Sequence, residues 1–156
     1  MNSNIQPQIF VSFSTKDMKI CEEFIQKLSS SDFDFWYQED INLGQEYKKI
    51  IKQNINSSVA SVLLLSQNFL DSEFIKTQEM PWIYEKDEKS MIYEIFPIQI
   101  ETCEWPSIDY LEKKQVFPAG GASLDLDNKE HLNLISREIS NYLKNAGYIE
   151  RKGWFR

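Results

Sequence analysis

Apolar and polar residues alternate along this chain in patterns that predict strands and helices in turn. The central element is residues 59–65, a short apolar run bounded by polar residues. Such a run is typical of a strand buried on both faces, at the middle of a parallel sheet. We predict a loop over residues 66–72 at the carboxyl end of this strand, followed by a helix that carries Glu79. Ligands bind at this edge of open α/β sheets, so we expect the Glu79 carboxylate to face a crevice there.

Shorter patterns of the same two kinds fill the rest of the chain. Short apolar segments predict four further strands, at residues 8–13, 33–37, 91–100 and 115–117. Apolar positions three or four residues apart predict further helices, at residues 18–28, 47–55 and 127–145. Ser14 is expected to cap the first of these helices, and Gly147 to end the last. Pro81 is expected to kink the Glu79 helix, and Pro97 to leave the pairing of the fourth strand incomplete.

The alternation of strands and helices defines the fold class. Five strands with short connections and right-handed crossovers predict an α/β fold, a flavodoxin-like five-stranded parallel sheet of order 2-1-3-4-5 with helices on both faces. In that order the chain reverses between the first and third strands, so the loops after these two strands flank one crevice. The topology therefore brings Ser12, Phe13 and Ser14 close to Glu79.

Length and composition narrow the class of protein. A chain of 156 residues fits one domain, which we place at residues 1–147, with residues 148–156 as a C-terminal tail or linker stub. The 17 basic and 24 acidic residues give a net charge of −7 without a basic run, so nucleic acid is not an expected partner. The first residues do not resemble a signal peptide, and no segment approaches the roughly 18 apolar residues of a membrane span. We therefore expect a cytoplasmic protein without a membrane partner.

The predicted crevice lacks the residues of several common sites. The turn Phe13-Ser14-Thr15-Lys16 has no glycine to cradle a phosphate, and the chain has no dinucleotide or Walker fingerprint. The single histidine, His131, has no nucleophile signature near it, which favours a surface residue. Cys21 and Cys103 are too few for a disulfide framework or, with one histidine, for a zinc site. Carboxylate chemistry at Glu79 remains, against the alternative that it is a solvated helix residue like most helical glutamates.

Four short motifs occur in a fixed order along the chain. The first is Ile9-Phe10-Val11-Ser12-Phe13-Ser14 with Lys16-Asp17, and the second is Phe35-Trp36-Tyr37 with Ile41-Asn42-Leu43-Gly44. The third is Leu63-Leu64-Leu65-Ser66 with Phe69, Ser72, Phe74 and Glu79, and the fourth is Phe96-Pro97-Ile98. In this order, over residues 8–145, the chain resembles a TIR (Toll/interleukin-1 receptor) domain. The stretch before Glu79 is closer to bacterial TIR domains than to animal receptor ones.

The resemblance implies a substrate and a set of site residues. Many bacterial relatives hydrolyse or cyclise NAD, and Glu79 stands at the place of the family's catalytic glutamate. The corresponding substrate-binding residues are Ser12, Phe13 and Ser14 beside the nicotinamide, Asn42 and Leu43 in a mobile loop at residues 40–46, and Phe74. Two positions differ from the family. Gln38 stands where many relatives have Asp, and Phe74 precedes Glu79 by five residues where the best-known eukaryotic pattern has four.

Two functions from different classes follow from the resemblance. The first is an NAD+ nucleosidase that cleaves the nicotinamide–ribose bond and releases nicotinamide with ADP-ribose or a cyclic ADP-ribose isomer. NAD+ is then the substrate, and no cofactor or metal is expected. Such an enzyme would act in bacterial antiphage defence, activated by self-association with other TIR domains and by a sensor domain or nucleotide-signal receptor. The alternative is a non-catalytic adaptor that signals through TIR–TIR contacts at residues 38–46, and Glu79 favours the enzyme over it.

Overall fold

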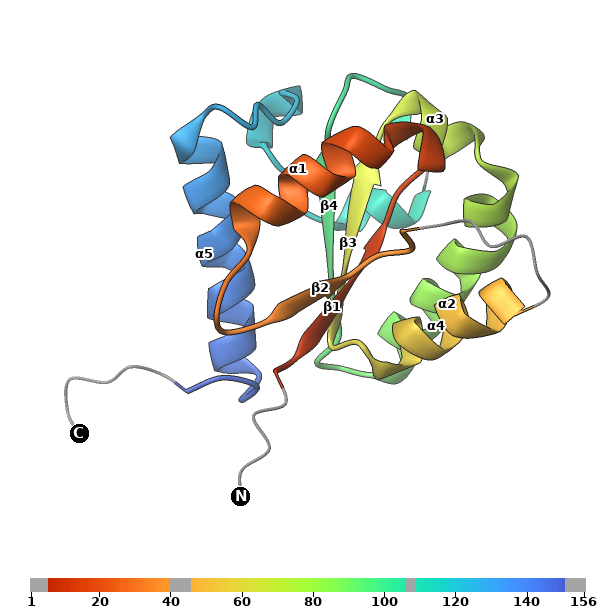
Figure 1. Ribbon diagram of the computed structural model, residues 1–156, viewed down its shortest axis with the longest axis horizontal. Coiled ribbons are helices and arrows are strands. Elements are labelled where there is room, and N and C mark those ends of the chain that lie inside the picture. Colours follow the sequence, from red (N-terminus) through yellow and green to blue (C-terminus); the bar gives the residue numbers. More distant parts are fainter. Residues whose placement is uncertain (1–5, 40–45, 106–108, 151–156) are drawn as a thin grey trace.

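Four parallel strands form one sheet in the part of the chain that the structure describes. The computed structural model describes residues 6–39, 46–105 and 109–150. The strands are β1 (Gln8–Ser12), β2 (Asp34–Trp36), β3 (Ala60–Leu65) and β4 (Glu94–Gln99), in the spatial order β2-β1-β3-β4 (Figure 1). The predicted parallel α/β sheet, with its reversal between the first and third strands, is confirmed over these four strands.

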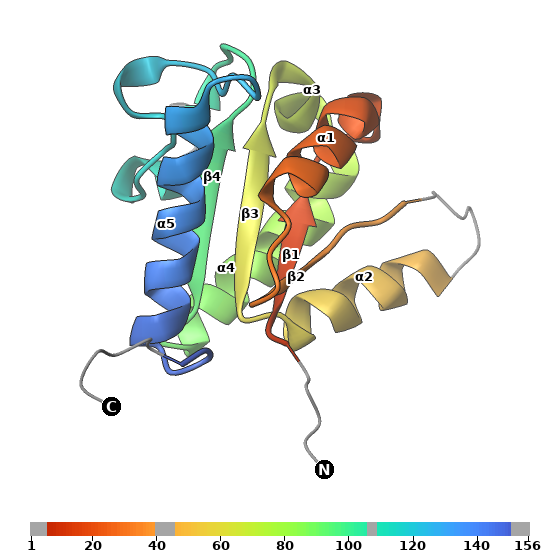
Figure 2. The same cartoon turned by 60° about the vertical axis from the view of Figure 1, so that its left-hand side comes forward.

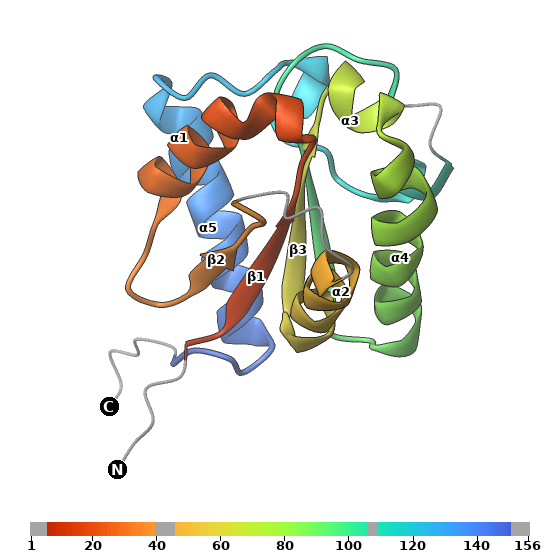
Figure 3. The ribbon, with the colours of Figure 1, turned by 45° about the vertical axis from the view of Figure 1, so that its right-hand side comes forward.

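Helices cover both faces of this sheet, as the sequence predicts. One face carries α1 (Met18–Leu28) and α5 (Lys129–Asn145), and the other carries α2 (Glu46–Ser57) and α4 (Met80–Lys89) (Figures 2 and 3). At the end of α5, Gly147 adopts a φ of 83°, a conformation that favours glycine. The two layers of helices leave the carboxyl ends of the strands as the edge where a ligand could enter.

The residues predicted as a loop after β3 contain a short helix instead, α3 (Gln67–Asp71). Ser66 starts it, because its Oγ accepts a hydrogen bond from the Phe69 N–H at 3.0 Å. The loop prediction missed this cap because the apolar pattern over five residues is too short to show a helical period. α3 lies beyond the carboxyl end of β3 (Figure 1).

Strand alternation divides the core into two layers around β3, whose residues are all buried. Val62 and Leu64 belong to the layer under α1 and α5, whereas Leu63 and Leu65 belong to the layer under α2 and α4. Burial of each such side chain contributes about 1.5–3 kcal/mol relative to exposure. A register shift of one residue would exchange the two layers. The register of this strand therefore determines which side chains face α1 and α5 and which face α2 and α4.

The predicted fifth strand at residues 115–117 is wrong, and the sheet ends at β4. Within the described residues, Phe117 makes a single parallel bridge, to Ile98. The Pro97 carbonyl accepts from the Phe117 N–H at 2.9 Å, so the proline nitrogen, which carries no hydrogen, faces this same outer side. Two residues further along, the Gln99 carbonyl is bonded to the Leu124 N–H at 2.7 Å. The gap that Pro97 makes therefore falls on the outer edge, while pairing with β3 continues across it.

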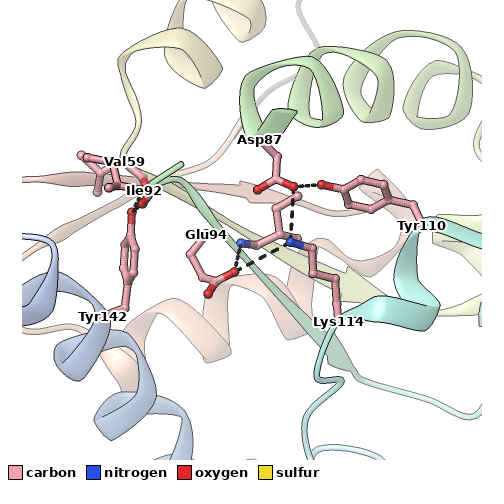
Figure 4. Close-up of polar contacts among 8 residues, drawn as sticks. Val59, Asp87, Ile92, Glu94, Tyr110, Lys114 and Tyr142 are labelled. Atoms are coloured by element: carbon pink, nitrogen blue, oxygen red, sulfur yellow. Dashed lines mark hydrogen bonds and ion pairs between the residues drawn. The ribbon is translucent and has the colours of Figure 1, made fainter. Parts of the chain in front are cut away.

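Polar side chains hold the chain where the fifth strand was expected (Figure 4). Lys114 Nζ lies 3.3 Å from Asp87 Oδ2 on α4 and 3.9 Å from Glu94 Oε1 on β4. Tyr110, in the 3-10 helix η4 (Asp109–Lys113), donates its hydroxyl hydrogen to Asp87. Lys114 and Asp87 are largely withdrawn from solvent, with side chains 20% and 16% exposed. Side-chain contacts thus replace a backbone ladder in tying this segment to the sheet edge.

Asp17 joins the two loops that flank the reversal of the sheet. Its Oδ2 accepts a hydrogen bond from Ser66 Oγ at 2.6 Å, and its Oδ1 accepts one from Asn68 Nδ2 at 3.0 Å. Asp17 follows β1, whereas Ser66 and Asn68 follow β3. The carboxylate therefore fixes the carboxyl ends of β1 and β3 relative to each other, at the edge where the site is predicted.

We expect Asp17→Ala to lower the free energy of unfolding by about 2 kcal/mol, because a hydrogen bond to a charged group is worth about 1.5–3 kcal/mol. Chemical denaturation followed by circular dichroism measures the change. Asp32→Ala, at an exposed position ahead of β2, is the matched control and should cost less than about 0.5 kcal/mol. A cost for Asp17→Ala as small as that of the control would contradict the role assigned to Asp17.

Candidate active site

A cavity of about 160 Å³ opens near the carboxyl end of β1, between the sheet, α2 and the helical turn that leads into α4. Its lining residues come from β1 and the loop after it, the segment after β2, α2, and residues 72–79. They are Phe10, Val11, Phe13, Thr15, Gln38, Tyr47, Ile51, Ser72, Phe74, Ile75 and Glu79. Glu79 is the one charged residue among these described lining residues, so the cavity is a mostly apolar site with a single acid.

Glu79 is buried against the end of β1. The residue is only 7% exposed. Its Oε1 accepts a hydrogen bond from Ser12 Oγ at 2.7 Å. Alternation along β1 explains this contact, because Ser12 follows Phe10 by two residues and Phe10 belongs to the layer under α2 and α4. The topology thus brings Ser12 to Glu79, as the sequence predicts.

Burial changes the acidity of this carboxyl group. Removal from water disfavours the charged form and raises the pKa of Glu79 from 4.5 to about 7. The hydrogen bond from Ser12 acts in the opposite direction and lowers the pKa, but by less than burial raises it. The side chain therefore holds comparable amounts of acid and carboxylate near neutral pH.

A π-helical turn, Ile75–Glu79, sets the direction of Glu79. In this turn the Met80 N–H donates to the Ile75 carbonyl, five residues back, where an α-helix uses the fourth. Residues five apart therefore lie over one another, and Phe74 and Glu79, which have this spacing, both line the cavity. The turn ends two residues before Pro81, in the helix where the sequence predicts an irregularity.

Aromatic rings line the cavity together with the acid. Phe13 lies 6.2 Å from Tyr37, measured between ring centres, on the side of β2. Tyr47 of α2 lies 5.4 Å from Phe74, measured in the same way, and Phe74 makes an edge contact with Trp82 at 6.3 Å. Contacts of this kind add about 0.5–1.5 kcal/mol each beyond their buried area. The aromatic residues that line the cavity are thus held in place by packing against neighbouring rings.

Three of the predicted site residues meet around the cavity: Phe13, Phe74 and Glu79. Ser12 contacts Glu79 but is itself only 1% exposed and does not line the cavity. A direct contact between Ser12 and a substrate is therefore disfavoured in this arrangement, and the roles of the other three toward a substrate remain predictions.

The other predicted site residues lie elsewhere or outside the described ranges. Ser14 is 7% exposed, and its Oγ accepts a hydrogen bond from the Lys16 N–H at 3.2 Å, which caps the 3-10 turn Thr15–Asp17. Asn42 and Leu43 are outside the described residues. Ser14 is therefore a cap, as predicted, but of the 3-10 turn and not of α1, which begins after Asp17 without a side-chain cap.

Sequence reasoning missed the part of the cavity that α2 supplies. Tyr47 and Ile51 lie four residues apart on the apolar face of α2, and both line the cavity, as does Gln38 ahead of this helix. The argument from topology places the crevice between two loops and leaves out the helix beside it. The signal was present, because Phe10 shares a strand face with Ser12, and the helix that covers Phe10 must border the same site.

Other reactive groups of the described chain lie away from the cavity. His131 accepts a hydrogen bond at Nδ1 from the Asp125 N–H at 3.0 Å. Cys21 is on the buried face of α1, and burial, with smaller contributions from Glu22 and Asp17, raises the pKa of its thiol to about 12. Among the described residues, no group of three or more His, Cys, Asp or Glu side chains is arranged to hold a metal ion. None of the described helices is long and apolar enough to cross a membrane.

Comparison with known proteins identifies the family. Residues 9–133 match the sequence model of the family described as TIR domain. This match covers most of the chain, which therefore belongs to the TIR domain family. The resemblance inferred from the four sequence motifs is confirmed.

Two curated proteins also match parts of the chain. The uncharacterized protein y4lF of Sinorhizobium fredii (strain NBRC 101917 / NGR234) is 24% identical over 103 residues, or 64% of this chain and 32% of that protein. A probable 2' cyclic ADP-D-ribose synthase, TcpO of Methanobrevibacter olleyae, is 34% identical over 68 residues, or 42% of this chain and 20% of that protein. The matched regions thus span about a third and a fifth of the length of these relatives.

We expect the free energy of unfolding of Glu79→Gln to increase relative to that of the wild type as the pH rises. In the wild type the folded state holds the Glu79 proton up to about pH 7, whereas the unfolded chain releases it near pH 4.5. The folded state therefore binds more protons between these values, and the free energy of unfolding falls as the pH rises through them. Glutamine carries no such proton. The advantage of the variant should grow by roughly 2 kcal/mol between pH 5 and pH 8.

Denaturant titrations at several pH values measure this difference, with Glu85→Gln as the control. Glu85 is an exposed glutamate of α4, and its pair with Lys89 is between exposed side chains. Its substitution should give a stability difference that hardly changes with pH. If the difference in the free energy of unfolding between Glu79→Gln and the wild type is also independent of pH, the folded state does not hold the Glu79 proton.

Proposed function

We propose that this TIR domain cleaves the bond between nicotinamide and ribose in NAD+. The observation that carries the proposal is a single buried carboxylate, Glu79, in an aromatic-walled cavity at the carboxyl edge of the sheet. This is the edge at which open α/β folds bind their ligands. The name of TcpO, a probable 2' cyclic ADP-D-ribose synthase, adds support from a partial relative. The products are nicotinamide and either ADP-ribose or a cyclic isomer of it.

The chemistry suits a carboxylate without a partner acid. Departure of nicotinamide from ribose passes through an oxocarbenium-like state, as in glycoside hydrolysis, and the positively charged ring is already a good leaving group. No proton donor is required. A fixed carboxylate next to the ribose stabilises the positive charge that develops on the sugar, and the apolar surroundings of Glu79 strengthen this interaction relative to water.

The aromatic walls give the nicotinamide ring its place. Phe13 and Phe74 line the cavity with Glu79, so in this proposal a planar ring bound against them lies close to the carboxylate. A positively charged ring also interacts favourably with aromatic faces. Approach of this ring favours the ionised form of Glu79, so substrate binding and loss of the Glu79 proton support each other.

The size of the cavity bears on how the site is completed. At about 160 Å³ the cavity is smaller than the roughly 300–1,000 Å³ of pockets that enclose a drug-sized ligand. Only the nicotinamide end of the dinucleotide fits within it. TIR domains commonly self-associate, so in this proposal a second copy of the domain provides surface for the rest of the substrate.

Two acceptors compete for the ribose cation in this mechanism. Water gives ADP-ribose, whereas a hydroxyl or the adenine of the same molecule gives a cyclic product. Exclusion of water from the reacting carbon in the assembled site would favour the intramolecular route. Separation of the products by chromatography distinguishes the two routes directly.

We expect Glu79→Gln to reduce nicotinamide release at least about a hundredfold, since loss of one preorganised electrostatic contact typically costs 10²–10³ in rate. Glutamine keeps the shape of the side chain and can still accept from Ser12, so the fold is retained. Glu85→Gln on α4 is the matched control and should release nicotinamide at the wild-type rate. Equal release by the wild type and Glu79→Gln would remove Glu79 from the mechanism.

We further expect the specific activity to rise with protein concentration, because assembly completes the site. Nicotinamide release per milligram, measured across a hundredfold range of concentration and compared with the size of the particle by light scattering, tests this. A constant specific activity would show that one copy suffices. No release from the concentrated wild type, even with crowding agents, would favour the alternative function of a non-catalytic TIR adaptor.

A further inference from the structure

Ser12 is the last residue of β1 and is held in the sheet close to the cavity. It is 1% exposed and lies in parallel register with Leu63 on β3, the central strand. Its Oγ points across the sheet–helix interface to Glu79 Oε1 at 2.7 Å. Within the described residues, Ser12 is the one side chain that donates a hydrogen bond to Glu79.

We propose that Ser12 is a positioning residue of the active site: its buried hydroxyl holds the Glu79 carboxylate in place and stabilises its ionised form. This assignment replaces the sequence-based one, in which Ser12 binds substrate directly. Its consequence for catalysis rests on the proposed NAD+ cleavage, whereas the effect of Ser12 on the ionisation of Glu79 does not.

The geometry separates this role from simple packing. A hydroxyl that donates to a carboxylate makes a charge-assisted hydrogen bond, which is roughly twice as strong as one to a neutral carboxylic acid. The contact therefore favours the charged state of Glu79 in particular. Burial raises the pKa of the same group, so Ser12 limits how far the apolar surroundings convert the carboxylate to the acid.

No other charged group of the described chain lines this cavity. Tyr47 on α2 is the other titratable residue in the lining. Exposed charged side chains flank the cavity after β1 and β2, on α2 and around the π-helical turn: Lys16, Glu39, Glu46, Lys48, Lys49, Lys52, Glu73 and Lys76. On α4, the half-buried Lys86 donates to the Ile55 carbonyl and the half-buried Asp87 pairs with Lys114, and neither lines the cavity. Asp17 is engaged by Ser66 and Asn68. Exposed charges are screened by water and salt, so the Ser12 hydroxyl is the local group that acts on Glu79.

A matched serine exists on the same sheet. Ser61 on β3 is completely buried, and its Oγ is hydrogen-bonded to the Tyr93 hydroxyl, away from the cavity. Ser61→Ala removes a buried hydroxyl from the central strand without touching Glu79. A comparison of Ser12→Ala with Ser61→Ala therefore separates the effect on the acid from the general cost of losing a buried hydrogen bond.

The first measurement is the pKa of Glu79 by carbon-13 NMR of its side-chain carboxyl, with the resonance assigned by its absence in Glu79→Gln. Ser12→Ala should raise this pKa by about one unit, a tenfold change in the ratio of acid to carboxylate. Ser12→Cys, which retains a weaker donor of similar size, should give a smaller rise. Ser61→Ala should leave the Glu79 pKa unchanged. A Glu79 pKa that is the same in the wild type and in both Ser12 variants would overturn the proposal.

The second measurement is the pH dependence of kcat/KM for nicotinamide release from NAD+. The rate should fall on the acid side as Glu79 becomes protonated, and in Ser12→Ala this fall should move toward alkaline pH by the same one unit. Loss of activity in Ser12→Ala should thus be about tenfold at pH 6 and smaller at pH 9, whereas Ser61→Ala keeps the wild-type profile. A pH-independent loss would overturn the assignment. If the wild type releases no nicotinamide, the proposed function fails, and the NMR titration still decides the role of Ser12.

Discussion

The burial of one carboxylate between a parallel sheet and its covering helices is the constraint around which this site is organised. Glu79 stands in an apolar layer where an ion is poorly solvated, and Ser12 is the described side chain that offsets part of that cost. A protein selected for stability alone would gain by placing an apolar residue there. An acid retained at such a position is the pattern expected of a site where stability is given up for chemistry.

Most of the fold follows from the apolar pattern, because each element satisfies a simple physical requirement. The run at β3 must be buried on both faces, so it must lie inside a parallel sheet covered by helices. The expected fifth strand fails for a reason of the same kind. Apolar character predicts that residues 115–117 are buried, and Phe117 is, but burial alone does not provide hydrogen bonds, and Pro97 removes the donor a ladder needs.

The position of the candidate site could be predicted from the strand order. The directions of the side chains around it could not. Strand order alone brings the end of β1 to Glu79. Which of Ser12, Phe13 and Ser14 reaches the cavity depends on strand alternation and on the local turn. Ser12 contacts Glu79, Phe13 lines the cavity, and Ser14 caps a 3-10 turn. The contribution of α2 was missed because it comes from the lateral packing of a helix, which loop positions do not describe.

The π-helical turn before α4 has a consequence for how related sequences are compared. In this chain the turn adds one residue to the helix, and Phe74 and Glu79, five residues apart, both face the cavity. A motif search with a fixed interval would pass over such chains. Alignments that permit a one-residue gap inside this helix would match the aromatic residue and the acid of such chains to Phe74 and Glu79.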